Sequence, residues 1–219
     1  MPTFLLIRHG ETDYVKKHHL AGRLPGVDLN EKGRLQAQVL ANKLAEAPVK
    51  AIYSSPLERT GQTAAPLAQA LGLPVIIRPG LIETDTGEWT NQSWKRLARL
   101  KVWRTVQSAP SLFRFPGGET FAEAQHRICQ ELEHISRQHQ LQDLIACFSH
   151  ADPIRLAVAF YIGLPLDMFQ RLSVSPGSIT VLQIGEASAR LLTLNYDPAF
   201  TLIPSPLPSP ANRRPPTDN

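Results

Sequence analysis

Two arginines, two histidines and a glutamate carry the chemistry that this sequence suggests. Each lies shortly after a short apolar run, and they are Arg8-His9, Arg59, Glu83 and His150. Arginine presents a planar, permanently charged fork that matches phosphate oxygens. Two neighbouring histidines would oppose one another's protonation in a purely structural cluster, but a bound phosphate dianion compensates both. The residue types therefore indicate chemistry on a phosphate ester.

These residue types allow a transfer in two steps. A neutral imidazole nitrogen can attack phosphorus and form a covalent phosphohistidine, which divides one difficult displacement into two easier ones. Glu83 can protonate the leaving alcohol and later activate water, provided that its surroundings raise the pKa of its carboxyl group. Asp85 and Glu88 lie close by and remain alternatives for this acid. Cationic donors stabilise the phosphoryl oxygens, so we expect no metal ion and no other cofactor.

The segments that must position these residues alternate between short apolar runs and amphipathic stretches, which is typical of an α/β fold. Asn30, the pair Ser55-Pro56 and the pair Thr120 and Glu123 have the types and spacing of helix starts. We predict a three-layer α/β/α fold with a mostly parallel central sheet. The strands are expected at 3–7, 49–53, 75–77 and 143–147, the helices at 31–46, 55–71, 120–139 and 153–162, and an edge hairpin at 178–184 and 190–194.

Parallel strands bring the candidate residues together. In open α/β sheets, ligands bind in the crevice at the carboxyl ends of the strands. The arginines, histidines and glutamate all follow predicted strands, so we expect them to meet at one edge of the sheet. This convergence supports a phosphate site more strongly than any single motif does.

An ordered set of motifs carries a resemblance to a known family. LLIRHGET, SSPLERTGQTA, LIETDTGEW, PGGETF and FSHADPIR follow one another within residues 4–182. Together they resemble the histidine phosphatase superfamily, whose members are phosphoglycerate mutase-like proteins. The resemblance implies that His9 is phosphorylated, that Arg8, Arg59 and His150 hold the phosphoryl group, and that Glu83 is the proton donor.

The rest of the signature loop also takes its expected roles from the resemblance. Gly10 would permit close approach of the backbone to substrate, Thr12 could donate a hydrogen bond to it, and Glu11 would organise the loop. Two positions depart from the usual pattern: Val15 stands where many members have Asn, and Ala151 where Gly is common. Valine cannot make the polar contact of that Asn, which is either missing here or supplied by Lys16, His18 or His19.

Two segments are expected to select the leaving group. Residues 90–118 contain Trp94, Leu97, Leu100 and Trp103 at helical spacing and should pack over the site. Residues 15–23 contain two lysines, two histidines and Arg23, which form either a basic mouth that attracts acidic substrates or a plain solvated loop. The three tryptophans, at 89, 94 and 103, are expected to pack rather than to stack on substrate.

The resulting prediction is a metal-independent phosphomonoester hydrolase that acts on a small phosphorylated metabolite. A phosphoglycerate mutase-type phosphomutase would use the same residues, and a non-catalytic module that binds phosphorylated ligands is a third candidate. The compactness of residues 59–117 favours the hydrolase over the mutase. Retention of His9, Glu83 and His150 argues against the binding module, because binding alone needs no nucleophile or acid. The substrate stays open, and so does the choice between monomer and homodimer.

Composition sets the remaining expectations. The 219 residues include 42% apolar and 19% charged residues, which suits one globular domain over 1–203. The Pro-rich segment 204–219 is expected to be a flexible tail. The net charge of +4 favours an anionic ligand, whereas no dense run of Lys and Arg among aromatics indicates nucleic-acid binding.

The setting of the protein is expected to be the cytoplasm. No apolar run approaches the roughly 20 residues that cross a bilayer, and the first residues lack the features of a signal peptide. Cys129 and Cys147 are expected to be small core residues in a reducing compartment. Three further histidines are expected at the surface of a polar helix: His126, His134 and His139.

Overall fold

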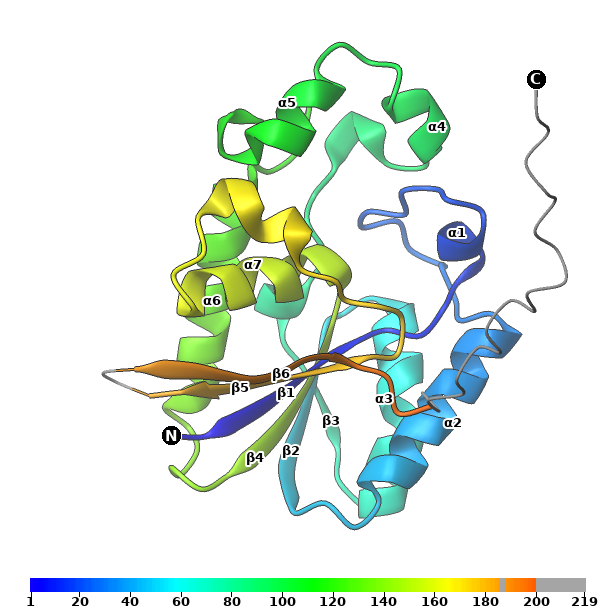
Figure 1. The fold of residues 1–219 in the computed structure, drawn as a ribbon. Helices are drawn as coiled ribbons and strands as arrows, with labels where there is room; N and C mark the ends of the chain where they lie inside the picture. Colours follow the sequence, from blue (N-terminus) through cyan, green and yellow to red (C-terminus); the bar gives the residue numbers. More distant parts are fainter. Residues whose placement is uncertain (186–187, 200–219) are drawn as a thin grey trace, which may run out of the picture.

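The computed structural model describes residues 1–185 and 188–199 and contains a six-stranded mixed sheet (Figure 1). The strand order is β3-β2-β4-β1-β5-β6. The first four strands in this order run parallel, β5 pairs antiparallel with β1, and β6 pairs antiparallel with β5. The strands are β1 (Thr3–Arg8), β2 (Val49–Ser54), β3 (Val75–Ile77), β4 (Leu144–Ser149), β5 (Ile179–Ile184) and β6 (Ala189–Tyr196).

Helices cover both faces of this sheet and confirm the predicted three layers. In Figure 1, α2 (Glu31–Leu44) and α3 (Glu58–Leu71) lie on one face. On the other face lie α6 (Phe121–Ser136) and α7 (Ala151–Tyr161). Successive residues of a strand point to opposite faces, so the buried β1 divides its side chains between two cores. Phe4 and Leu6 pack towards α6 and α7, whereas Leu5 and Ile7 pack towards α2 and α3.

Two of the predicted helix starts are confirmed by their hydrogen bonds. The side chain of Asn30 accepts from the amide of Gly33 at 2.9 Å and caps α2. Thr120 and Glu123 form a reciprocal capping box at the start of α6. Each interaction satisfies amide groups that a helix leaves unpaired at its first turn.

The predicted start of α3 at Ser55-Pro56 is wrong. The helix begins at Glu58, its N-cap is Leu57, and no side chain caps it. The hydroxyl group of Ser55 forms a hydrogen bond with His150 instead. A tertiary partner therefore takes the place of the local cap that the sequence suggests.

The segment expected to pack over the site forms a separate cover built from short helices. It contains η2 (Gly87–Trp89), α4 (Trp94–Leu97), α5 (Trp103–Ser108) and η3 (Pro110–Leu112). The helical spacing of its apolar residues is therefore divided between two helices, because the chain turns between Leu97 and Trp103. An aromatic and aliphatic core ties the cover to α6, α7 and η4 (Leu166–Arg171), with Phe113, Phe115, Phe121 and Phe169 at its centre.

The prediction for His139 is wrong, whereas His126 and His134 are exposed as expected. The side chain of His139 is only 12% exposed because α6 ends before it and the chain folds back onto the sheet. Its Nε2 lies 2.9 Å from the hydroxyl of Tyr53, and its Nδ1 lies 3.3 Å from a carboxylate oxygen of Asp143. His139 therefore belongs to the packing beneath the sheet.

Both cysteines are unpaired and buried, as predicted. Burial raises the pKa of each thiol, so neither is suited to act as a nucleophile. The predicted tail at 204–219 and the end of the predicted domain at 203 lie outside the described residues. Within the described ranges, none of the helices combines the length and apolar character needed to cross a membrane.

Candidate active site

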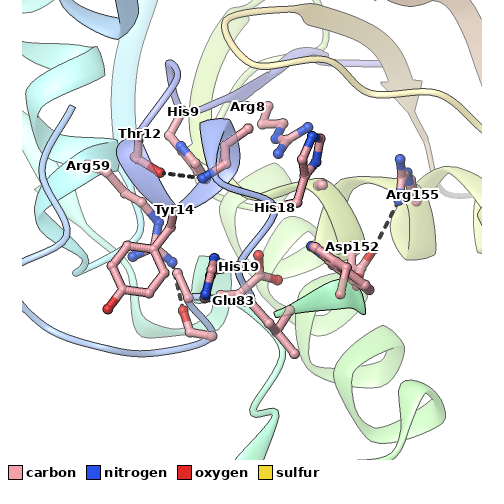
Figure 2. A pocket seen from close by; sticks show the side chains of 16 residues that line it. Arg8, His9, Thr12, Tyr14, His18, His19, Arg59, Glu83, Asp152 and Arg155 are labelled. Atoms are coloured by element: carbon pink, nitrogen blue, oxygen red, sulfur yellow. Dashed lines mark hydrogen bonds and ion pairs between the residues drawn. The ribbon is translucent and has the colours of Figure 1, made fainter. Parts of the chain in front are cut away.

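The carboxyl ends of the parallel strands bring together the residues singled out in the sequence. Arg8 ends β1 and His9 follows it, while His150 directly follows β4 and caps α7. Arg59 comes from the first turn of α3, and Glu83 follows the short helix η1 (Pro79–Leu81) after β3. A cavity of about 240 Å³ lies here, and Figure 2 shows Arg8, His9, Arg59 and Glu83 around it.

His9 is held in the tautomer that leaves one ring nitrogen available. Its side chain is 4% exposed, and Nδ1 lies 2.7 Å from the carbonyl oxygen of Gly10. A carbonyl oxygen can only accept, so Nδ1 carries the proton and Nε2 keeps its lone pair. Burial, reinforced by the charges of Arg59 and Arg8, holds the pKa of His9 well below its usual value. The imidazole is therefore neutral near pH 7, as a nucleophile requires.

His150 is completely buried behind the cavity and is oriented by Ser55. Its Nε2 lies 2.8 Å from Oγ of Ser55, and its ring lies 5.2 Å from that of His9 between centroids. Oγ of Ser55 already accepts from the amide of Leu57, so its own proton is directed to Nε2 of His150. Nδ1 of His150 therefore carries a proton. It has no hydrogen-bond partner among the described residues. Burial and the nearby positive charges lower the pKa of His150 strongly.

Both arginines are anchored at one nitrogen and unpaired at another. Arg8 donates from Nη1 to the carbonyl oxygen of Val174 at 2.7 Å, and Arg59 donates from Nη2 to that of Gly22 at 2.8 Å. Within the described residues, Nε of Arg8 and Nη1 of Arg59 are buried and lack a partner. Burial lowers the pKa of Arg8 to about 10 and lowers that of Arg59, so both stay charged at neutral pH. Buried N–H groups left unpaired are costly, which suits them to an anion.

Glu83 has the raised pKa that an acid in this position needs. Burial, followed by the negative charge of Asp152, raises the pKa of Glu83 to about 7. One carboxylate oxygen accepts from the amide of Thr84 at 2.8 Å, and the other lies 3.9 Å from Nδ1 of His150. The side chain is 18% exposed, so it can reach both a leaving group and water.

The main chain at Glu83 is fixed by two arginines that share a carboxylate. Arg23 donates to the carbonyl oxygen of Glu83 at 2.8 Å, and Arg127 donates to that oxygen and to the carbonyl of Ile82. Glu119 forms ion pairs with both arginines, at 2.6 and 3.0 Å. Arg23 therefore does not belong to a basic mouth, because its charge is used to position the acid.

Gly10 serves the packing of the signature loop. Its amide donates to the hydroxyl of Thr63 at 3.0 Å, and a Cβ atom at Gly10 would lie 2.6 Å from the carbonyl oxygen of Gly33 in α2. Gly33 is restricted in turn, since its Cβ would lie 2.1 Å from the carbonyl oxygen of Glu11. This packing accounts for Gly10 without the predicted approach to substrate.

Glu11 and Thr12 occupy the places expected of them. Glu11 accepts from Asn30 and pairs with Lys32, both at 3.0 Å, so it organises the loop. The hydroxyl of Thr12 lines the cavity and accepts from the amide of Val15 at 3.3 Å, which leaves its own proton free to donate to a ligand.

The departures from the family pattern both lie in the cavity wall. Val15 and Ala151 line it, together with His18 and His19, whereas Lys16 does not. The loop that carries the two histidines is joined to the cover by main-chain hydrogen bonds, one from Trp94 to His18. His18 and His19 are therefore the polar groups placed to contact a ligand where the apolar side chain of Val15 cannot.

Several residues of the site are not predicted by the sequence patterns. Ser55 has the features of a helix cap there, and the motif that contains His150 draws no attention to Asp152 and Arg155. Asp152 and Arg155 form an ion pair at 3.2 Å in the cavity wall, shown in Figure 2. The spacing of these two residues on α7 is the available signal, because residues three apart lie on the same side of a helix. In the described ranges, no cluster of three or more His, Cys, Asp or Glu could hold a metal ion.

Comparisons with known proteins agree with this geometry. Residues 4–197 match the profile of the histidine phosphatase superfamily, branch 1. Phosphoserine phosphatase 1 of Hydrogenobacter thermophilus is 31% identical over 200 residues, which cover 89% of this chain and 92% of that protein. The 2,3-bisphosphoglycerate-dependent phosphoglycerate mutase of Thermoplasma acidophilum is 28% identical over 202 residues, with 89% and 92% coverage.

A solved structure shows the same fold. YhfR of Bacillus stearothermophilus superposes with a TM-score of 0.83 at 23% identity, over 90% of this chain and 98% of that one.

Proposed function

Because this chain belongs to the histidine phosphatase superfamily, we propose that it is a metal-independent phosphomonoester hydrolase that works through a phosphohistidine at His9. One observation carries the proposal. Three nitrogens from three different elements are buried around His9 without partners in the described part of the chain: Nε of Arg8, Nη1 of Arg59 and Nδ1 of His150. Three N–H donors converging beside a neutral imidazole match the oxygens of a phosphoryl group.

In the first step, Nε2 of His9 attacks phosphorus and the bond between phosphorus and the ester oxygen breaks. Glu83, protonated up to about pH 7, gives its proton to the departing alkoxide. The carbonyl of Gly10 accepts from Nδ1 of His9 and stabilises the charge that develops on the ring. Arg8, Arg59 and His150 hold the phosphoryl oxygens throughout the transfer.

In the second step, Glu83 is a carboxylate and takes a proton from water. The resulting hydroxide forms a new bond to phosphorus as the bond from phosphorus to Nε2 breaks. Phosphate is released, and His9 and Glu83 return to their starting protonation states. Arg23 and Arg127 hold the main chain of Glu83 through both steps, so one carboxyl group serves as acid and then as base.

The competing outcome is a mutase, in which the phosphoryl group returns to a second hydroxyl of the substrate instead of passing to water. The short helices of the cover favour hydrolysis, because a mutase must keep water away from the phosphoenzyme. The proposed ligand is a small phosphorylated metabolite, with no part for nucleic acid or a membrane, and the protein is proposed to be a monomer or homodimer. We place it in the cytoplasm, which the two unpaired buried thiols support.

The test compares the wild type with His9→Ala on p-nitrophenyl phosphate in the presence of a chelator. We expect the substitution to lower kcat by roughly 10³-fold or more. Acid-sensitive, base-stable label from a ³²P-labelled substrate should appear on the peptide that contains His9. His134→Ala removes an exposed histidine and is the matched control, with unchanged turnover expected.

Each alternative has its own result. Equal turnover by the wild type and His9→Ala would exclude His9 as the nucleophile. Interconversion of 2- and 3-phosphoglycerate with negligible release of phosphate would replace the hydrolase by a mutase. Binding of phosphate esters without any label or turnover would show a binding module.

A further inference from the structure

A second cavity, of about 320 Å³, adjoins the active site beneath the cover. Leu20, Trp94, Asp152 and Arg155 line both cavities, so the two share a wall. The volume lies within the range of pockets that hold small organic molecules, roughly 300 to 1,000 Å³. A group attached to the phosphoryl oxygen therefore has a place to go, and its chemistry can be inferred from the lining.

The lining of this second cavity is largely aromatic. Trp89 and Trp103 lie nearly parallel, with 6.2 Å between ring centroids and 29° between planes. Trp94 meets Trp103 edge to face at 5.7 Å, and Phe115 meets Trp89 in the same way at 5.5 Å. The predicted packing role of the tryptophans is real, since they contact one another, but the packing leaves a hollow among them.

The polar groups around this hollow carry little net charge. Arg155 is paired with Asp152 at the shared wall, and the other polar side chains of the lining are Gln107 and Gln170. A second anionic group on the substrate would find no unpaired cation here among the described residues. An uncharged flat ring would find aromatic faces and edges on several sides, with amide and guanidinium donors at the rim.

We propose that the preferred substrates are phosphate esters of alcohols that carry an uncharged aromatic group, and that this group occupies the cavity lined by Trp89, Trp94, Trp103, Phe115 and Phe121. This inference rests on the proposed function, because it takes the phosphoryl group to be held at His9. The cover then selects the leaving group by aromatic contact, while the cradle of arginines and histidines recognises only the phosphate.

The experiment compares two esters that share the same kind of leaving alkoxide: 2-(naphthalen-2-yl)ethyl phosphate and ethyl phosphate. Their chemical steps are matched, so a difference in kcat/KM reports binding of the ring. We expect the wild type to prefer the naphthyl ester at least about tenfold. Trp103→Ala removes one face of the cavity, and Gln107→Trp fills the hollow from its exposed rim. Each should lower the ratio of the two kcat/KM values by at least about fivefold.

Leu112→Ser is the matched control, because this residue belongs to the same cover but is 81% exposed and does not line the cavity. Its ratio should equal that of the wild type. Circular dichroism on each variant identifies any loss of folding, and Gln107→Trp keeps the test valid if Trp103→Ala unfolds.

The outcomes separate this inference from the proposed function. Hydrolysis of both esters with equal kcat/KM in the wild type, or ratios unmoved in both cavity variants, would overturn the aromatic preference while leaving the hydrolase intact. Absence of turnover and of label at His9 with either ester would count against the hydrolase itself.

Discussion

At the level of single residues, the site depends on two histidines that stay neutral between two charged arginines. Burial and the charges of Arg8 and Arg59 lower the pKa of both His9 and His150. Each histidine also has a fixed tautomer, set by the carbonyl of Gly10 in one case and by the hydroxyl of Ser55 in the other. One ring can therefore attack phosphorus while the other donates a hydrogen bond, although the two side chains are chemically identical.

Replacement of Ser55 by alanine tests the tautomer of His150. Without the hydroxyl donor, Nε2 of His150 no longer needs to accept, so the proton is free to move from Nδ1 to Nε2. We expect Ser55→Ala to lower kcat by roughly 10-fold to 100-fold, because the transferring phosphoryl group then has one donor fewer. Nitrogen chemical shifts of His150 should show Nδ1 protonated in the wild type and a mixture of tautomers in the variant. An unchanged tautomer together with unchanged kcat would contradict this role.

Replacement of Asp152 by asparagine tests the electrostatic cause of the raised Glu83 pKa. The negative charge of Asp152 favours the protonated form of Glu83, so its removal lowers the pKa of Glu83 from about 7. The phosphorylation step needs the protonated acid, and kcat/KM therefore falls as pH rises through this pKa. We expect Asp152→Asn to move that basic limb of the pH profile to lower pH.

The measurement is kcat/KM on p-nitrophenyl phosphate between about pH 5 and pH 8. Glu133→Gln removes the same charge from an exposed position near the far end of α6 and should leave the profile in place. A basic limb that does not move in Asp152→Asn would assign the raised pKa to burial alone.

Among the secondary-structure elements, α2 fixes the position of the signature loop. Its first turn contains Gly33, on which the backbone of residues 10 and 11 rests. Gly33→Ala places a Cβ atom against the main chain of Glu11, where no flexible side chain can yield. We expect it to lower the free energy of unfolding by roughly 1 to 3 kcal/mol and to reduce kcat by displacing His9.

Gly61→Ala is the matched control for this steric effect. Gly61 lies inside α3, and a Cβ atom there would meet nothing within 4 Å. Alanine is the better helix former, so this variant should gain roughly 0.5 to 1 kcal/mol with normal turnover. Chemical denaturation and turnover on p-nitrophenyl phosphate measure both variants, and equal behaviour of the two would remove the steric argument.

The strands and the catalytic residues can be predicted because their signals are local or repeat in order along the chain. Apolar runs of strand length predict the sheet, and Asn30 and Thr120 predict two helix starts through bonds from side chain to backbone that span three residues. The prediction for Ser55 is wrong because its partner, His150, lies 95 residues away. The same limit applies to Arg23, whose bond to the carbonyl of Glu83 spans 60 residues. The contacts that tune the site come from tertiary structure, which local patterns do not record.

For the whole molecule, the buried cationic groups predict stabilisation by anions. Inorganic phosphate or tungstate would satisfy the unpaired nitrogens of Arg8, Arg59 and His150, and it binds only the folded chain. At about 100 times its Kd, such a ligand adds roughly 2.7 kcal/mol of stability, which raises Tm by about 5 to 10 °C in a protein of this size.

Differential scanning calorimetry with phosphate, and with chloride at equal ionic strength, measures this effect. Arg59→Gln should lose most of the rise in Tm, whereas Arg137→Gln should keep it, since the Arg137 side chain is 81% exposed. A rise of the same size in chloride would show general screening of charge instead of a site.

The division of the pocket has a consequence for how the enzyme responds to its surroundings. The nitrogens that hold the phosphoryl group come from Arg8, Arg59 and His150, and the leaving group is left to the aromatic cover. Free phosphate can therefore form every contact that the phosphoryl group of a substrate forms. It competes with substrate as the reaction product, so turnover slows where phosphate is plentiful and quickens where it is scarce. The cradle that accelerates release of phosphate also makes the enzyme a gauge of how much phosphate is already present.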